Sequence, residues 1–129
     1  MDQQIVDDSS IPDDALLLRR VPLQPQAVIL DKNGPVGWRP SSLAFKDSQM
    51  SAFLASEASV DQIMDGYQNF ALAAVTAKLV RDHGQIIVRR PADIPGHVEV
   101  IGPKSHSVLA QFARLAIWVR PPPEGYGTT

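Results

Sequence analysis

Apolar residues occur along this chain in short runs, and most of these runs end at or near a proline or glycine. Short apolar runs between such breaks are typical of strands rather than of long helices. We therefore expect strands over residues 15–21, 26–31, 50–55, 85–89 and 97–101. The pattern predicts an α+β fold, in which a single compact domain has a mixed sheet of about five strands packed against a C-terminal amphipathic helix and one or two shorter helices.

Two internal segments favour short helices. Residues 60–64 follow Ser59, a residue type that accepts hydrogen bonds from the first free N–H groups of a helix. The stretch 70–83 is ambiguous because its alanines and leucines are good helix formers. A strand over 70–76 followed by a short helix over 77–83 fits this stretch almost as well as one helix does.

The last element is predicted to be an amphipathic helix. Ser105 or Ser107 begins it, and three consecutive prolines at 121–123 end it. Apolar residues at helical spacing mark the face that should enter the core: Val108, Phe112, Leu115 and Val119.

Length and composition indicate one domain with flexible ends. The chain has 129 residues, of which 44% are hydrophobic and 20% are charged. We expect a disordered acidic leader over 1–13, an α+β domain over 14–120 and a Pro-rich flexible tail over 121–129. The absence of cysteine excludes a disulfide scaffold, thiol catalysis and cysteine-ligated metal sites. No apolar run reaches membrane-spanning length and the N-terminus has no basic region, so we expect a cytoplasmic protein without a membrane partner.

The net charge of −2 hides an uneven distribution, because the first 14 residues carry five aspartates and no base. The rest of the chain has a net charge of +3. This excess is too small for strong non-specific nucleic-acid binding, so we do not expect a nucleic-acid partner. The signatures of P-loop, dinucleotide-binding, metalloprotease, hydrolase and EF-hand proteins are absent, and the three histidines show no metal-ligand spacing. We predict no metal site.

The most informative polar segment runs from Trp38 to Phe45. Arg39 offers a planar guanidinium for a carboxylate or phosphate, and Ser41 and Ser42 add hydroxyls at the start of a helical turn. Trp38 and Phe45 could supply stacking surfaces. We predict that these five residues bind a ligand. The alternative, a helix N-cap with packing aromatic rings, explains Ser41, Ser42 and Phe45 but accounts less well for Trp38 and Arg39.

Polar residues also lie at the ends of two predicted strands. Arg19 and Arg20 are adjacent, so their side chains must point to opposite faces of the sheet. Each could bind an anion, or could extend out to solvent or pair with an aspartate. His97 and Glu99 share one face of the strand 97–101 and could form a pair suited to acid–base chemistry, although a surface-facing strand explains them equally well.

The chain resembles a group of small bacterial proteins that share an Arg-Pro-Ser-Ser-x-Ala-Phe segment and have no assigned activity. The resemblance covers roughly residues 16–122, and the matching segments are 19–21, 39–45, 50–53 and 95–98.

The chain also resembles, through a shorter and more degenerate pattern, the ADP-ribosyltransferase-like fold. That fold has an early strand ending in Arg or His, a later strand bearing Ser, Tyr or Thr, and often a final Glu or His. The counterparts here are Arg19 or Arg20, then Ser51, and then His97 or Glu99. This resemblance implies catalytic roles for Ser51, His97 and Glu99, with NAD as the cofactor.

The sequence thus supports two hypotheses from different functional classes. The first is a non-catalytic accessory or interaction module of a bacterial cytoplasmic system, which requires no cofactor and binds a protein partner through the cluster around Arg39. The second is a small nucleotide- or NAD-handling enzyme, in which Arg39 and Arg19 or Arg20 clamp the pyrophosphate and Trp38 or Phe45 stacks on the base. Nucleic-acid binding ranks third. The oligomeric state stays open.

Overall fold

The fold comes from a computed structural model of the chain, which describes residues 5–34 and 36–127. Residues 1–4 of the predicted leader, residues 128–129 of the predicted tail and Pro35 lie outside the described residues.

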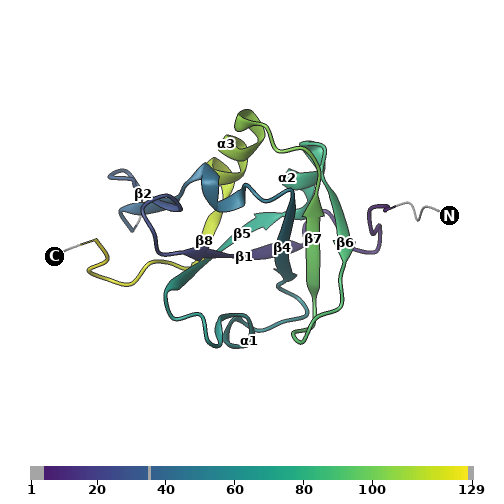
Figure 1. The fold of residues 1–129 in the computed structure, drawn as a ribbon, viewed down its shortest axis with the longest axis horizontal. Helices are drawn as coiled ribbons and strands as arrows, with labels where there is room; N and C mark the ends of the chain where they lie inside the picture. Colours follow the sequence, from purple (N-terminus) through teal and green to yellow (C-terminus); the bar gives the residue numbers. More distant parts are fainter. Residues whose placement is uncertain (1–4, 35, 128–129) are drawn as a thin grey trace.

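Most strands belong to one sheet. They are β1 (Leu16–Pro22), β4 (Gln49–Leu54), β5 (Phe70–Thr76), β6 (Ile86–Arg89), β7 (His97–Ile101) and β8 (Ile117–Arg120). These six strands lie in the order β6-β7-β4-β1-β5-β8, and every pairing is antiparallel. Two short strands, β2 (Val28–Leu30) and β3 (Trp38–Pro40), form a separate hairpin. The helical segments are the 3₁₀ turn η1 (Ser42–Phe45) and the helices α1 (Val60–Met64), α2 (Ala77–Asp82) and α3 (His106–Leu115) (Figure 1).

The centre of the sheet is the pair β1–β5. The two strands are in register along their whole length, from Leu16 opposite Thr76 to Pro22 opposite Phe70. On its other side β1 pairs with β4, where Leu18 lies opposite Phe53. Because β1 lies between two strands, its side chains must enter the two faces of the sheet alternately.

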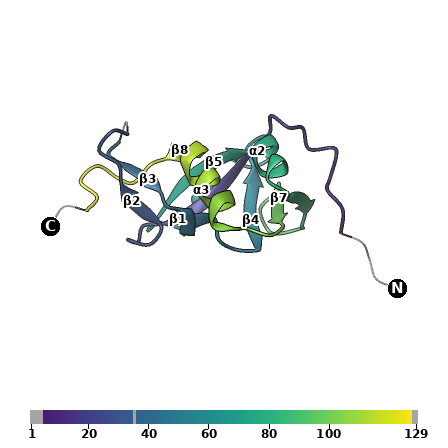
Figure 2. The same cartoon turned by 90° about the horizontal axis from the view of Figure 1, so that it is seen from above.

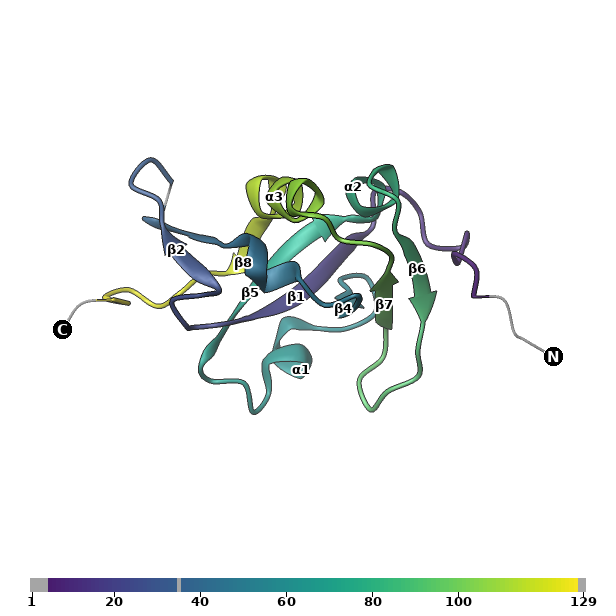
Figure 3. The ribbon, with the colours of Figure 1, turned by 45° about the horizontal axis from the view of Figure 1, so that its top comes forward.

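The sheet separates two layers of unequal size. Figure 1 shows α2 and α3 above the sheet and α1 below it, and Figure 3 gives the same arrangement from a different angle. The larger cluster of buried residues lies on the upper side and includes Leu17, Val21, Phe45 and Phe112. The smaller cluster lies on the α1 side and includes Leu18, Phe53, Ile63 and Leu72. Seen from above, the β2–β3 hairpin lies at the end of the molecule away from the N-terminal segment (Figure 2).

Local side-chain bonds fix the starts of the short helices. Ser59 and Gln62 form a reciprocal capping box at α1, in which each side chain bonds the backbone N–H of the other residue. Thr76 caps α2 by accepting a hydrogen bond from the Leu79 N–H. The cap at Thr76 also marks the residue where strand β5 gives way to a helix.

The predicted α+β class is confirmed, with two refinements to the sheet. The sheet has six strands rather than about five, and it is antiparallel throughout rather than mixed. Of the two readings of residues 70–83, the strand followed by a short helix is the one observed. The strand expected over 26–31 exists as β2, but it belongs to the hairpin and not to the main sheet.

The predicted extent of the C-terminal helix was wrong. Helix α3 ends at Leu115, and Val119 lies in strand β8. Leu115 and Val119 are exposed by 48% and 37%, so they do not belong to the buried face, which consists of Leu109, Phe112 and Ala113. Ile117, Trp118 and Val119 are β-branched or aromatic, and such residues favour a strand when a neighbouring strand, here β5, is within reach.

Parts of the predicted leader and of the predicted tail make contacts with the domain. Within the predicted leader, Ile11 is buried in the larger core, and the Asp8 N–H bonds the Ile87 carbonyl of the edge strand β6 at 2.8 Å. The Asp7 carboxylate accepts the Ile87 N–H at 2.9 Å. Within the predicted tail, the ring of Tyr126 packs edge-on against Trp38 at 4.9 Å between centroids.

We expect Phe112→Ala to lower the free energy of unfolding by about 3–5 kcal/mol, because a fully buried ring is lost from the larger core. Leu115→Ala, on the same helix but half exposed, should cost much less. Chemical denaturation of both variants measures the difference. Equal losses would contradict the placement of α3 on the sheet.

Candidate functional site

The two arginines of β1 lie on opposite faces of the sheet, as predicted. Arg19 is on the upper side and is largely buried, with 16% of its side chain exposed. Its guanidinium donates to the backbone carbonyls of Ala44 and Ser51 and forms an ion pair with Asp47 at 2.8 Å. These contacts join β1 to η1 and β4. The Arg19 guanidinium is therefore bonded within the chain through each of its three nitrogens, and its role is structural.

Arg20 points to the α1 side, and part of its guanidinium is available to bind a further group. Its Nε donates to the Ile63 carbonyl at 2.8 Å, and its guanidinium carbon lies 3.6 Å from the ring centre of Tyr67 and 4.8 Å from that of Phe53. Burial is the main cause that lowers the pKa of Arg20. Among the described residues no carboxylate forms an ion pair with Arg20. A half-buried cation without an anion is a candidate binding group.

Ser51 and His97 form a direct contact on the same side of the sheet. The Ser51 Oγ lies 2.5 Å from His97 Nε2. Pairing of β4 with β7 places Phe53 opposite His97 and Ser51 opposite Glu99, so Ser51 and His97 are diagonal neighbours across the two strands. The prediction of catalytic roles for these residues did not foresee that they touch.

The contact of the second ring nitrogen of His97 shows which group is the donor in the hydrogen bond between Ser51 and His97. Nδ1 lies 2.8 Å from the Arg90 carbonyl, and a carbonyl can only accept a hydrogen bond. In the neutral ring Nδ1 therefore carries the proton and Nε2 is the acceptor for the Ser51 hydroxyl. Glu99, which the sequence suggested as a partner of His97, instead pairs with the Arg90 guanidinium at 2.9 Å.

The predicted ligand-binding cluster at Trp38–Phe45 is dispersed in the structure. The Ser41 hydroxyl is buried and donates to the Gln26 carbonyl, and Phe45 is fully buried against Phe112. Ser42 begins η1 and has no hydrogen bond through its side chain among the described residues. Only Trp38 and Arg39 remain beside open space. The packing alternative therefore accounts for Ser41 and Phe45.

Trp38 and Arg39 line a cavity of about 550 Å³ between the hairpin and the end of the sheet. We call it the β3–β8 groove, and its lining includes Trp38, Arg39, Arg114, Ile117 and Trp118. The Trp118 indole N–H donates to the Trp38 carbonyl at 2.9 Å and holds the hairpin against β8. Within the described chain Arg39 and Arg114 have no acidic partner, and both are exposed.

The residues proposed to clamp a nucleotide do not form one site. His97 and Glu99 are on β7, whereas Arg39 lies beyond β8, which is four strands away from β7 in the sheet. At a normal strand spacing these two strands are roughly 19 Å apart. Arg19 faces the opposite side of the sheet from Ser51 and is fully engaged. The hypothesis of an NAD-handling enzyme thus loses the predicted Arg39 clamp.

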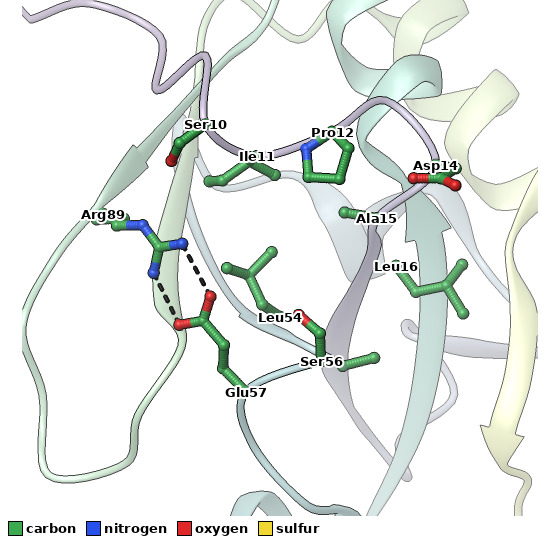
Figure 4. Close-up of a pocket in the computed structure, with 11 residues that line it drawn as sticks. Ser10, Ile11, Pro12, Asp14, Ala15, Leu16, Leu54, Ser56, Glu57 and Arg89 are labelled. Carbon is green, nitrogen blue, oxygen red and sulfur yellow. Dashed lines mark hydrogen bonds and ion pairs between the residues drawn. The ribbon is translucent and has the colours of Figure 1, made fainter.

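A further pocket lies where the N-terminal segment crosses the ends of β1 and β4. Its volume is about 460 Å³, and Figure 4 shows Arg89 and Glu57 facing each other at its side. Both terminal nitrogens of Arg89 bond the Glu57 carboxylate at 2.8 Å, and its Nε bonds Asp8 at 3.0 Å. These charges neutralise one another, so the pocket presents no free cation from Arg89. It anchors the N-terminal segment.

Several contacts of polar residues were not predicted from the sequence. Arg90 orients His97 through its carbonyl, and Arg114 joins Arg39 in the groove. Lys104 Nζ donates to the carbonyls of Ser48 and Val100, and burial lowers the pKa of Lys104 to about 8. Contacts of this kind join segments far apart in the sequence, and no local pattern signals them.

The ion pair at the N-terminal segment predicts an acid-sensitive contribution to stability. Hydrogen bonding from Arg89 lowers the pKa of Glu57 below its ordinary value, so the folded chain binds this proton less readily than the unfolded chain does. The stabilisation is present above the ordinary pKa of glutamate, about 4.3, and is lost as the pH falls through the lower folded value. We expect melting temperature to fall less steeply with acidification in Glu57→Gln than in the parent chain. Glu124→Gln, a control at an exposed glutamate, should show the same pH dependence of melting temperature as the parent chain. If Glu57→Gln also kept the pH dependence of the parent chain, the ion pair with Arg89 would not contribute to stability in solution.

Comparison of the chain with protein-family models, with curated proteins and with solved structures finds no match. Over residues 5–34 and 36–127, no helix is long and apolar enough to cross a membrane. In the same residues no group of three or more His, Asp or Glu side chains is gathered in a way that could hold a metal ion. The function must therefore be inferred from the geometry of the sites themselves.

Proposed function

We propose that this protein is a cytoplasmic interaction module that binds an acidic, extended segment of a partner protein in the β3–β8 groove. The observation that carries the proposal is the open edge of the sheet beside two arginines, Arg39 and Arg114, that have no acidic partner among the described residues. Among the described strands β8 pairs only with β5, so its outer backbone N–H and C=O groups have no strand partner, and Ile117 and Trp118 of this strand line the groove. Such an edge is a template for one more strand.

The groove supplies both affinity and selectivity for such a segment. Backbone hydrogen bonds to β8 would hold an extended peptide of any sequence. Alternate side chains of that peptide would face the apolar wall formed by Trp38, Ile117 and Trp118. Ile117 is 57% exposed, which leaves apolar surface available for contact.

Charge favours an acidic partner over other extended peptides. Arg39 and Arg114 both line the groove, and its only acidic lining residue among those described is Asp31. A guanidinium binds a carboxylate or a phosphate through two parallel hydrogen bonds, so either group on the partner would match Arg39. Specificity then depends on the spacing between the acidic group and the strand-pairing segment.

The alternative of a nucleotide-handling enzyme rests on a different observation, the contact between Ser51 and His97. Trp38 and Arg39 would have no part in such an enzyme, because they lie at the other end of the sheet. We therefore place the interaction module first.

A short synthetic peptide of alternating valine and glutamate tests the proposal directly. We expect its addition to shift the NMR signals of the backbone amides of Ile117–Arg120. Arg39→Ala should weaken binding about tenfold, because one charge-assisted hydrogen-bonded pair is lost. Added salt should weaken binding to the parent chain by screening the same pair.

Two controls separate groove binding from general charge attraction. Lys46→Ala removes an exposed positive charge outside the groove and should leave the affinity unchanged. A peptide of alternating valine and lysine should not bind. The proposal fails if the amides of β8 do not respond, or if Arg39→Ala and Lys46→Ala have the same effect.

A further inference from the structure

A separate inference concerns the α1 side of the sheet, which the groove does not use. Ser51, His97, Arg90, Glu99 and Arg20 all lie on or beside this face, and each is only partly exposed. A serine in a strand needs no histidine partner to satisfy its hydroxyl, because water or a backbone carbonyl would do so. The contact between Ser51 and His97 is therefore not required to satisfy the serine hydroxyl.

We propose that Ser51 is a nucleophile activated by His97, and that it accepts acyl groups from activated esters or thioesters that carry a negative charge. The contact meets the first geometric requirement for this chemistry, since hydroxyl and base are within hydrogen-bond reach. The second requirement is a group that orients the base, and the Arg90 carbonyl provides it through Nδ1.

The supporting contacts hold His97 in one position. The Arg90 N–H donates to the His97 carbonyl at 3.1 Å, while the Arg90 carbonyl receives the His97 Nδ1–H, so the two residues are tied by two hydrogen bonds. The ring of Phe53 lies against the imidazole at 5.3 Å between centroids. The ion pair of Arg90 with Glu99 anchors the same segment to β7. Arg90 and Phe53 are thus positioning residues.

The reaction balances without a further reagent. The Ser51 Oγ forms a bond to the acyl carbon while its proton moves to His97 Nε2. The bond from the acyl carbon to the leaving oxygen or sulfur then breaks, and the leaving group takes the proton from Nε2. Water, with His97 again as the base, releases the acid and restores the Ser51 hydroxyl.

Arg20 determines the charge of the substrate. It has no ion-pair partner among the described residues, and its guanidinium stacks on the same Phe53 ring that contacts His97. The Arg20 guanidinium carbon lies 4.8 Å from the centre of the Phe53 ring, and that centre lies 5.3 Å from the centre of the imidazole. The distance from the guanidinium to the imidazole therefore cannot exceed these two distances added together. A small ester with a carboxylate at one end could span this interval. A half-buried cation needs an anion, and the substrate would supply it.

The test uses the full chain and the p-nitrophenyl esters of acetic acid and of succinic acid, the second of which keeps a free carboxylate. We expect an acyl adduct on Ser51 by intact and peptide mass spectrometry, with faster p-nitrophenol release from the succinate ester. His97→Gln should slow acylation about a hundredfold or more, as loss of a general base does.

Matched variants separate chemistry from folding. Ser51→Ala should abolish the adduct, whereas Ser56→Ala, a change at an exposed serine on the neighbouring loop, should leave it unchanged. Arg20→Met keeps an apolar stem against the aromatic rings but removes the charge, so it should erase the preference for the succinate ester. Thermal denaturation confirms that each variant is folded. Adducts spread over several serines, no adduct on Ser51, or equal rates in folded His97→Gln and the parent chain would each overturn the proposal.

Discussion

The architecture depends on two adjacent arginines in the central strand. Because neighbouring side chains of a strand point in opposite directions, Arg19 and Arg20 place one guanidinium on each face of a sheet that is otherwise apolar at its centre. Each charge needs polar partners close to the core. Arg19 finds them in the carbonyls of η1 and β4, and Arg20 in the last turn of α1 and in two aromatic rings. One covering segment of each layer, η1 above and α1 below, is thus bonded to one of these two residues.

This arrangement leaves the two ends of the sheet free for different chemistry. At β4 and β7 the α1 side carries a polar row, because the small helix α1 covers only part of that face. At β8 the hairpin β2–β3 stands beside the sheet without joining it, held by the bond from Trp118 to Trp38. The central strands β1 and β5 lie between these two ends of the sheet.

The sequence predicted those features that depend on near neighbours. The cap at Ser59, the strand β7 and the opposite directions of Arg19 and Arg20 all follow from local spacing and were confirmed. Features set by distant contacts were missed. The change from helix to strand after Leu115 depends on β5, and the burial of Ser41 and Phe45 depends on Gln26 and Phe112. Ser51 and His97 were each singled out as candidates, but only the pairing of β4 with β7 brings them into contact.

The N-terminal segment occupies the sheet edge opposite β8. Its Asp7 and Asp8 bond both the N–H and the C=O of Ile87, in the middle of the edge strand β6. The backbone groups of Ile87 are therefore not available to a strand of another chain. A new strand would meet this obstacle at β6 and no described strand at β8, so the two edges of the sheet differ in how open they are to pairing. By bonding its own acidic segment to β6, the chain protects that edge at Ile87, and β8 is the edge that lies open among the described strands.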